Sequence, residues 1–157
     1  MRSTRNALLA AATLVAATST VGAAPAQAAA APAAEVACAG YSNVWIGSSY
    51  YMHVPSTTGN SFNYNCVVVR GHYGIAVLVL QESLNACYHQ GIAQDYDFGP
   101  ATERAVRNAQ HTINSYPTEP VVAEDGRFGP QTSAHFEFQA YDHANGGHHE
   151  GWCDYRD

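Results

Sequence analysis

The sequence predicts a mainly α-helical fold, in which residues 71–141 form a compact module of three helices stapled by disulfide bonds. A short β-hairpin or loop arm over residues 38–70 precedes the module, and a tail over residues 142–157 follows it. Three observations predict this arrangement. The octet "DYDFGPAT" at 95–102 returns as "DGRFGPQT" at 125–132, apolar residues recur at helical spacing, and four cysteines are present.

The first residues have the pattern of a secretion signal rather than of a folded segment. Two arginines precede the apolar run "ALLAAATLVAA" at 7–17, and "AQA" at 26–28 offers the small residues that a signal peptidase needs. The apolar run is too short to span the roughly 30 Å of a bilayer core. We therefore predict a cleaved signal peptide over residues 1–28, followed by a disordered Ala/Pro-rich lead-in over residues 29–37.

The chain that remains after cleavage is acidic. It carries five arginines, no lysine and all 13 carboxylate side chains, which gives a formal charge of −8. Such a surface repels phosphate backbones and anionic lipids. Nucleic acid is therefore not an expected partner, and neither is a membrane once the signal has been removed.

The four cysteines lie at Cys38, Cys66, Cys87 and Cys153. An even number in an exported chain is typical of disulfide bonds, here two. Three pairings are possible, and the sequence alone does not choose among them. We favour Cys38–Cys66, which would close the N-terminal hairpin, and Cys87–Cys153, which would tie the tail to the first helix.

The arm and the first helix differ in their hydrophobic period. In the arm, "SSYYMHV" and "NYNCVVV" flank the turn-like "PSTTGN" at 55–60, which predicts a hairpin or a loop-rich segment. From Ile75 to Tyr88, apolar residues then recur three and four positions apart, as on one face of an amphipathic helix. Those residues are Val77, Leu80, Leu84, and Cys87 with Tyr88.

The repeated octet has the features of a helix entry. Asp95 can accept backbone N–H groups in an Asx-type turn, and the proline that follows Phe-Gly suits the first turn of a helix. We predict a helix from Pro100 to Ile113, where "NSYPTEP" ends it, and a third helix from Pro130 to about Tyr141. Phe98 and its counterpart Phe128 are predicted to be buried between the helices.

Three motifs in this order resemble the peptidoglycan-binding domain family, a three-helix cell-wall module of exported bacterial proteins. The opening motif of the family is matched by Gly71, Gly74, Val77, Leu80, Gln81 and Leu84. Its second motif is matched by Asp95, Phe98, Gly99, Thr102, Ala105, Val106 and Gln110, and its closing motif by Asp125, Gly126, Gly129 and Thr132. The resemblance covers residues 71 to about 139, and Tyr96 stands where the family has glycine.

The resemblance implies a noncatalytic protein that binds peptidoglycan and needs no cofactor. Together with the predicted signal peptide, it implies a secreted protein associated with the cell wall. Two alternatives stay open. One is a small zinc-dependent cell-wall hydrolase that uses the histidine-rich tail, and the other is a module for interaction with another secreted protein.

Ligand-binding residues are expected around the two repeated turns. A cell-wall ligand offers sugar faces, amides and carboxylates, on which tyrosines stack and with which arginines pair, and helix N-termini there present free N–H groups. The residues predicted to bind are Tyr96, Asp97, Arg104, Asp125, Arg127 and Gln131. Gln81 and Gln110 are interpreted differently, as buried polar groups that bond loop backbone.

No catalytic group and no metal site are predicted. The tail histidines His143, His148 and His149, with Glu150, match neither His-Glu-x-x-His nor His-x-His spacing. The carboxylate neighbours Asp95/Asp97 and Glu124/Asp125 are interpreted as turn caps rather than as a glycosidase pair. A cysteine nucleophile is not expected, because all four cysteines are predicted to be oxidised.

Overall fold

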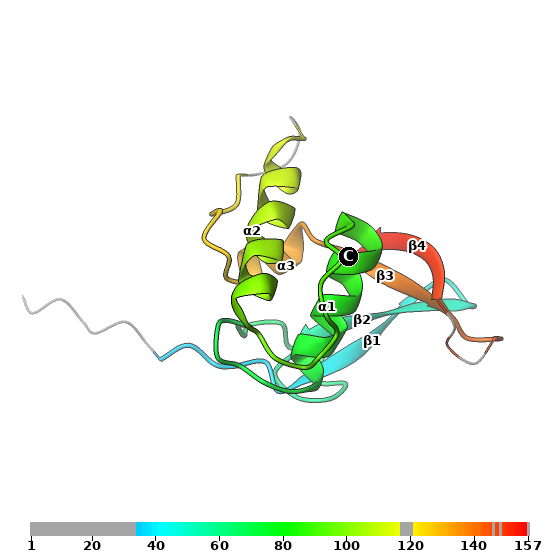
Figure 1. Ribbon diagram of the computed structural model, residues 1–157. Helices are drawn as coiled ribbons and strands as arrows, with labels where there is room; N and C mark the ends of the chain where they lie inside the picture. Colours follow the sequence, from blue (N-terminus) through cyan, green and yellow to red (C-terminus); the bar gives the residue numbers. More distant parts are fainter. Residues whose placement is uncertain (1–33, 117–120, 146, 148, 157) are drawn as a thin grey trace, which may run out of the picture. The chain divides into compact units, whose positions relative to one another are not determined.

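The computed structural model describes residues 34–116, 121–145, 147 and 149–156, so the predicted signal peptide lies outside the described residues. Within them, a four-stranded antiparallel sheet in the order β1-β2-β3-β4 packs with three helices (Figure 1). In chain order the elements are β1 (Gly40–Ile46), β2 (Tyr50–Ser56), α1 (Ile75–Tyr88), α2 (Pro100–Asn114), α3 (Pro130–Ala134), β3 (Glu137–Asp142) and β4 (His149–Tyr155).

The prediction of a mainly α-helical three-helix module is wrong. The third helix, expected from Pro130 to about Tyr141, ends at Ala134, and Glu137–Asp142 forms β3 instead. In "FEFQA" at 136–140, apolar and polar residues alternate, which is the two-residue period of a strand. The expected tail also contains a strand, since β4 pairs with β3 and ends the sheet.

The arm does contain a hairpin, but its turn lies elsewhere than predicted. Strands β1 and β2 pair from Gly40–Ser56 to Ile46–Tyr50, so the turn is at residues 47–49 and not at 55–60. Gly47 has a φ of 65°, which glycine adopts at little cost. Residues 57–66 form a loop instead, closed by a 2.9 Å hydrogen bond from the Thr57 N–H to the Asn63 carbonyl.

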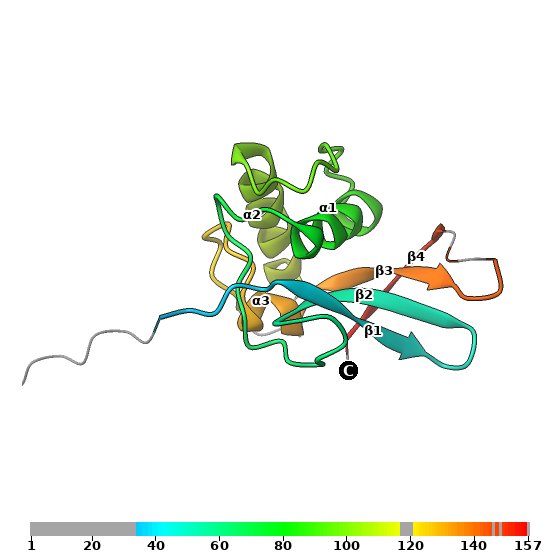
Figure 2. The same cartoon turned by 90° about the horizontal axis from the view of Figure 1, so that it is seen from below.

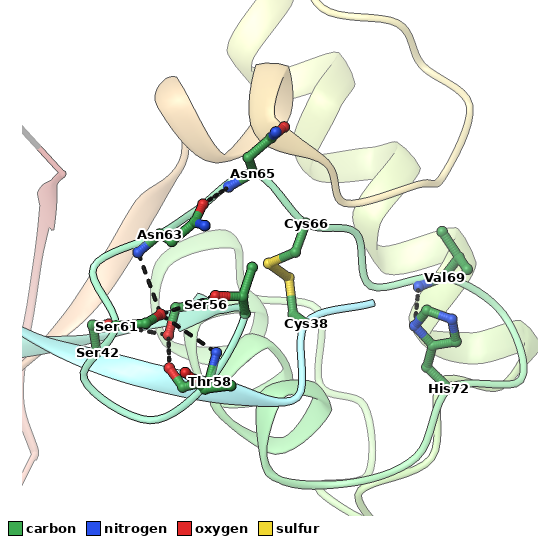
Figure 3. The surroundings of a disulfide bond; sticks show 11 residues. Cys38, Ser42, Ser56, Thr58, Ser61, Asn63, Asn65, Cys66, Val69 and His72 are labelled. Carbon is green, nitrogen blue, oxygen red and sulfur yellow. Dashed lines mark hydrogen bonds between the residues drawn. A yellow bond between two sulfur atoms is a disulfide. The ribbon is translucent and has the colours of Figure 1, made fainter. Parts of the chain in front are cut away.

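Both favoured disulfide bonds, Cys38–Cys66 and Cys87–Cys153, are confirmed. Figure 3 shows the first of them beside the 57–66 loop. The chain just before Cys38 was expected to belong to the disordered lead-in, but residues 34–37 are described and partly paired. The Val67 N–H donates to the Val36 carbonyl at 2.8 Å, and the Cys38 N–H donates to the Val67 carbonyl at 2.9 Å.

Helix α1 has the predicted bounds and is tied to the C-terminal half of the sheet. The Ser83 hydroxyl oxygen accepts the Gln139 N–H at 3.3 Å, and the Tyr88 hydroxyl oxygen accepts the Glu137 N–H at 2.8 Å. Figure 2 shows α1 and α2 side by side on one side of the sheet. No helix among the described residues is long and apolar enough to cross a membrane.

The phenylalanines of the two octets are buried, as predicted. Phe98 and Phe128 are 0% and 1% exposed. The Phe128 ring lies 5.2 Å from the ring of Phe136 and 6.2 Å from that of Phe138, both edge-on. The second octet thus anchors the entry of α3 to the start of β3, and a strand supplies the core contacts that the longer third helix was expected to make.

Candidate functional site

The first repeated turn is organised around the buried side chain of Gln81. Its Nε2 donates to Asp95 Oδ1 at 2.8 Å, to the Asp97 carbonyl at 3.0 Å and to Thr102 Oγ1 at 3.2 Å. Its Oε1 accepts the N–H groups of Asp95 and Tyr96. The Gln81 amide and the Asp97 N–H hold the pKa of Asp95 below its ordinary value. This carboxyl therefore stays ionised at lower pH, as suits a turn cap.

The second turn repeats this bonding around Gln110. Its Nε2 donates to Asp125 Oδ1 at 3.1 Å, to the Arg127 carbonyl at 3.0 Å and to Thr132 Oγ1 at 3.1 Å. Its Oε1 accepts the Gly126 N–H at 2.9 Å. The interpretation of both glutamines as buried groups that bond loop backbone is confirmed, and so are the Asx-type turns at both aspartates.

A second pair of side chains extends the repeat. Asn85 bonds both backbone groups of Ile92, each at 2.8 Å. Asn114 bonds both backbone groups of Val122 in the same way, at 2.9 and 2.8 Å. Each asparagine follows its glutamine by four residues on the same helix face. The repeated unit is therefore a helix with its following loop and turn, of which only the turn was recognised in the sequence.

Replacing Gln110 by leucine is expected to lower the free energy of unfolding by about 3 kcal/mol. The change leaves the buried Gly126 N–H without its partner, and an unpaired buried group costs about 1–3 kcal/mol. It also removes one of the two hydrogen bonds to the Arg127 carbonyl and the bonds to Asp125 and Thr132. Urea unfolding followed by circular dichroism would measure the loss. Gln131→Leu, an exposed control, should change stability by less than about 0.5 kcal/mol. Equal stability of the two variants would contradict the assigned role.

Tyr96 and Gly126 occupy equivalent positions in the two turns. Their φ angles are 67° and 76°, so the tyrosine adopts a left-handed conformation that glycine adopts at little cost. A Cβ on Gly126 would lie 2.8 Å from the Glu103 carbonyl oxygen, which excludes a side chain there. The exposed Tyr96 ring lies 6.2 Å from the exposed ring of Tyr73. A strained aromatic residue at the surface is typical of a functional site.

Replacing Tyr96 by glycine is expected to stabilise the fold by up to about 1 kcal/mol. A residue with a Cβ in the left-handed conformation costs about 1–2 kcal/mol. Glycine removes this cost, but it loses more backbone entropy on folding, which offsets part of the gain. The matched change Gly126→Ala should destabilise by more than about 1 kcal/mol, since it adds both the strain and the clash. Thermal unfolding of both variants would test the equivalence. Destabilisation by Tyr96→Gly would contradict it.

One segment, residues 67–74, connects the two turns. Val68 exchanges two backbone hydrogen bonds with Phe128, at 2.8 and 3.0 Å. Farther along, the Gly71 N–H donates to the Phe98 carbonyl at 3.1 Å, and the Gly74 N–H donates to the Tyr96 carbonyl at 2.9 Å. The segment therefore fixes the two turns relative to each other and places Arg70 between them.

Beside the second turn lies a hollow of about 240 Å³, which we call the arginine hollow. It is lined by Val69, Arg70, Glu103, Asp125, Gly126 and Arg127. Arg70 pairs with one oxygen of Glu103 at 3.3 Å, and Arg107 pairs with the other at 3.2 Å. Arg107 also donates to the Asp125 carbonyl at 3.2 Å. Three of the chain's seven arginines thus gather at one turn.

The N-terminal segment reaches the same turn. The Glu35 carboxylate accepts a hydrogen bond from the Arg127 guanidinium. Glu35 also lines two further hollows, of about 140 and 290 Å³, which share Val67 and Pro130. The smaller one shares Asp125 and Arg127 with the arginine hollow, so the three hollows adjoin along the 65–70 segment.

The structure brings together three of the six predicted binding residues. Asp125, Arg127 and Gln131 line one hollow beside the second turn. Tyr96 and Asp97 lie at the first turn, while Arg104 is exposed on α2 and lines none of the three hollows. Sequence reasoning missed Arg70, Arg107 and Glu35. Arg70 directly precedes Gly71, the first glycine of the motif on which the resemblance rests. Its place beside that motif was the signal that could have marked it as a candidate binding residue.

Two residues of the histidine-rich tail have defined contacts. The His143 ring packs edge-on against the Trp45 ring at 5.2 Å, and Cys153 is held in its disulfide. His148 and the side chains of His149 and Glu150 lie outside the described residues. Within the part of the chain that is described, no three His, Cys, Asp or Glu side chains are grouped to hold a metal ion.

Comparison with known proteins identifies no relative of this chain. No protein-family model matches the sequence, and no curated protein or solved structure matches it. What the chain binds must therefore be inferred from its own residues.

Proposed function

We propose that this chain is a secreted, noncatalytic peptidoglycan-binding protein whose arginine hollow binds a carboxylate of the wall's peptide. Three things support the proposal. The ordered motifs of residues 71–139 resemble the peptidoglycan-binding family, two disulfide bonds are typical of exported proteins, and Arg70, Arg107 and Arg127 gather in an otherwise acidic chain.

The observation that carries the proposal is the contact between Arg127 and Glu35. Glu35 belongs to a short segment that lies parallel to Val67 and is hydrogen-bonded to it through the backbone. Arg127 therefore already holds a carboxylate presented by a peptide. Peptidoglycan stem peptides present carboxylates in the same way, and a guanidinium binds them through paired, charge-assisted hydrogen bonds.

The ion pairs of the hollow are weak enough to be exchanged for a ligand. The side chains of Arg70 and Arg127 are 58% and 44% exposed. Pairs this exposed contribute about 0.2–1 kcal/mol, because water screens them. A ligand carboxylate can therefore replace Glu35 on Arg127 at little cost.

Co-sedimentation with purified cell-wall sacculi at low salt tests the proposal. The wild-type protein is expected to sediment at micromolar concentration, and Arg127→Gln and Arg70→Gln should each weaken retention about tenfold or more, as expected when a charged hydrogen bond is lost. Arg104→Gln is the matched control, because it removes the same charge from α2 outside the hollow. A wild-type protein that stays in the supernatant would refute binding. Equal losses in all three variants would refute the assigned site.

The variant Glu35→Gln gives a result of opposite sign. It frees Arg127 from its internal partner, so retention on sacculi should rise by up to about fivefold, the equivalent of a surface ion pair. Weaker retention in this variant would show that Glu35 supports the site rather than occupies it.

The same samples distinguish binding from hydrolysis. A noncatalytic protein leaves the sacculi intact, so no muropeptides should appear in the supernatant, with or without added zinc. Muropeptide release that a chelator abolishes would instead identify a zinc-dependent hydrolase and contradict the proposal.

A further inference from the structure

Six rings gather on β1, β2 and the end of β3, outside the repeated turns. They belong to Tyr41, Trp45, Tyr51, His53, Tyr141 and His143, which we call the aromatic cluster. The Trp45 ring lies 5.5 Å from Tyr51 and 5.2 Å from His143. Tyr51 stacks on Tyr141 with ring centroids 5.6 Å apart and an angle of 18° between the planes.

The aromatic cluster is buried at one end and open at the other. Tyr141 is 4% exposed, and its hydroxyl donates to the Glu82 carboxylate on α1 at 2.8 Å. Burial, with Glu82 beside it, raises the pKa of this hydroxyl, so it keeps its proton and its hydrogen bond. Trp45, near the end of β1, is 53% exposed. Packing of the Trp45 ring on Tyr51 across the strands stabilises the hairpin. This packing does not explain why about half of the Trp45 side chain is exposed to water.

The open end is held in a fixed arrangement. The His143 N–H donates to the Ser49 carbonyl at 2.9 Å, which joins the start of the β3–β4 loop to the β1–β2 turn. Gly147 has a φ of 83°, and a Cβ there would lie 2.7 Å from the Tyr51 hydroxyl oxygen. Glycine thus allows the loop backbone to approach this hydroxyl closely. Trp45, Tyr51 and His143 are therefore positioned before any ligand arrives, which lowers the entropy cost of binding.

The charges of the described residues indicate which ligand fits. Arg70, Arg107 and Arg127 lie at the second turn, Arg104 is on α2, and Arg156 lies over the Tyr64 ring at 4.2 Å. The chain has no lysine. None of these cations contacts the aromatic cluster, so its open end suits a neutral ligand better than an anionic lipid or phosphate. Flat rings with polar edges match the apolar faces and the hydroxyl and amide groups of sugars.

We propose that the open end of the aromatic cluster binds a neutral glycan of N-acetylated sugars. Trp45 and Tyr51 offer ring faces to the sugar, and His143 and the Tyr51 hydroxyl offer hydrogen bonds at its edge. This site goes beyond the proposed function, because it needs neither the arginine hollow nor a peptide. A second ligand region on the same chain would add to the retention given by the first.

The two tryptophans of the chain allow a direct test. Trp152→Phe leaves Trp45 as the only fluorescent indole, whereas Trp45→Phe leaves Trp152. Trp152 is similarly exposed but packs edge-on against Tyr50 at 5.3 Å. Tyr50 and Tyr51 point to opposite faces of the sheet, so Trp152 is a matched control on the other face.

The probe is chitotetraose, a soluble oligomer of N-acetylglucosamine without peptide. We expect a saturable blue shift of Trp45 emission in Trp152→Phe and no change in Trp45→Phe. In calorimetry, Trp45→Ala should weaken binding about tenfold or more, since a stacked ring contributes both buried area and a directional contact. Trp152→Ala and Arg127→Gln should bind as the wild type does.

Several outcomes would overturn the proposal. No heat and no spectral shift at millimolar chitotetraose would refute it, as would wild-type affinity in Trp45→Ala. Should Trp45→Ala fail to fold, as judged by circular dichroism, Tyr51→Phe removes only a hydroxyl and should still weaken binding; unchanged binding there would refute the assigned contact. Sacculus retention without chitotetraose binding would refute this site and leave the arginine hollow standing.

Discussion

Replacing Phe128 by alanine is expected to lower the free energy of unfolding by about 3–5 kcal/mol, the usual cost of removing a fully buried phenylalanine. The ring is 1% exposed and packs edge-on against Phe136 and Phe138. Its loss opens a cavity where the second turn, α3 and β3 meet. Urea unfolding at neutral pH, followed by circular dichroism, would measure the change.

Phe62→Ala is the matched control, because the same ring is removed from a residue that is 58% exposed. Its expected effect is below about 0.5 kcal/mol. A loss of less than 1 kcal/mol for Phe128→Ala would mean that the octet's phenylalanine is not a core anchor. Affinity for sacculi should fall together with the folded fraction in Phe128→Ala, since the turn that carries Arg127 depends on this anchor.

Removing the Cys87–Cys153 disulfide by a double change to serine is expected to destabilise the protein by about 4 kcal/mol. The bond closes a loop with a sequence separation of 66 residues, and the chain entropy of the unfolded state grows with loop length. This bond also ties β4 to α1, so its loss should release the C-terminal edge of the sheet. Hydrogen exchange of the β4 amides would show that release directly.

The Cys38–Cys66 bond provides the comparison. Its sequence separation is 28 residues, so the same entropy argument predicts a somewhat smaller loss, of about 3.5 kcal/mol. The two double variants should also differ in which amides exchange faster. Removal of Cys38–Cys66 should release the segment that carries Glu35, whereas removal of Cys87–Cys153 should release β4. A larger loss for the shorter loop, or uniform exchange in both variants, would contradict the assigned roles.

The part of the fold that local signals determine could be predicted from the sequence. Helices α1 and α2 have clear helical periodicity, and the octets combine an aspartate, a buried phenylalanine and a helix-starting proline. Gln81 and Gln110 were correctly interpreted, and each lies within a helix at nearly the same distance, 14 and 15 residues, before the aspartate of the following turn. The disulfide pairing that we favoured was confirmed as well.

The sheet depends on pairing between segments far apart in the chain, and the short alternation at 136–140 does not by itself identify the partner strands. Residues 135–141 follow the start of a helix, and their residue types occur in both helices and strands. The prediction therefore extended the five-residue α3 too far. Its partners decide the outcome: β3 pairs with β2, more than 80 residues earlier in the chain, and with β4. Strand pairing over such distances overrides local helix propensity.

The candidate sites illustrate the same limit. Asp125, Arg127 and Gln131 are close in sequence and were predicted together, whereas Arg70 and Glu35 reach the second turn only through the paired segments at 36–38 and 67–68. The aromatic cluster joins β1, β2 and β3, and was not recognised as a group from the sequence. Arg104 has the right chemistry but lies outside the hollows.

The most direct measurement of the central claim is an NMR titration of the isotope-labelled protein with soluble muropeptides. If the second turn binds the wall peptide, the backbone amides of Arg70, Gly126 and Arg127 should shift in a saturable way, together with Val67 as Glu35 is displaced. The equivalent amides of the first turn should shift much less. Saturable shifts confined to other parts of the chain, or none at millimolar ligand, would contradict the account.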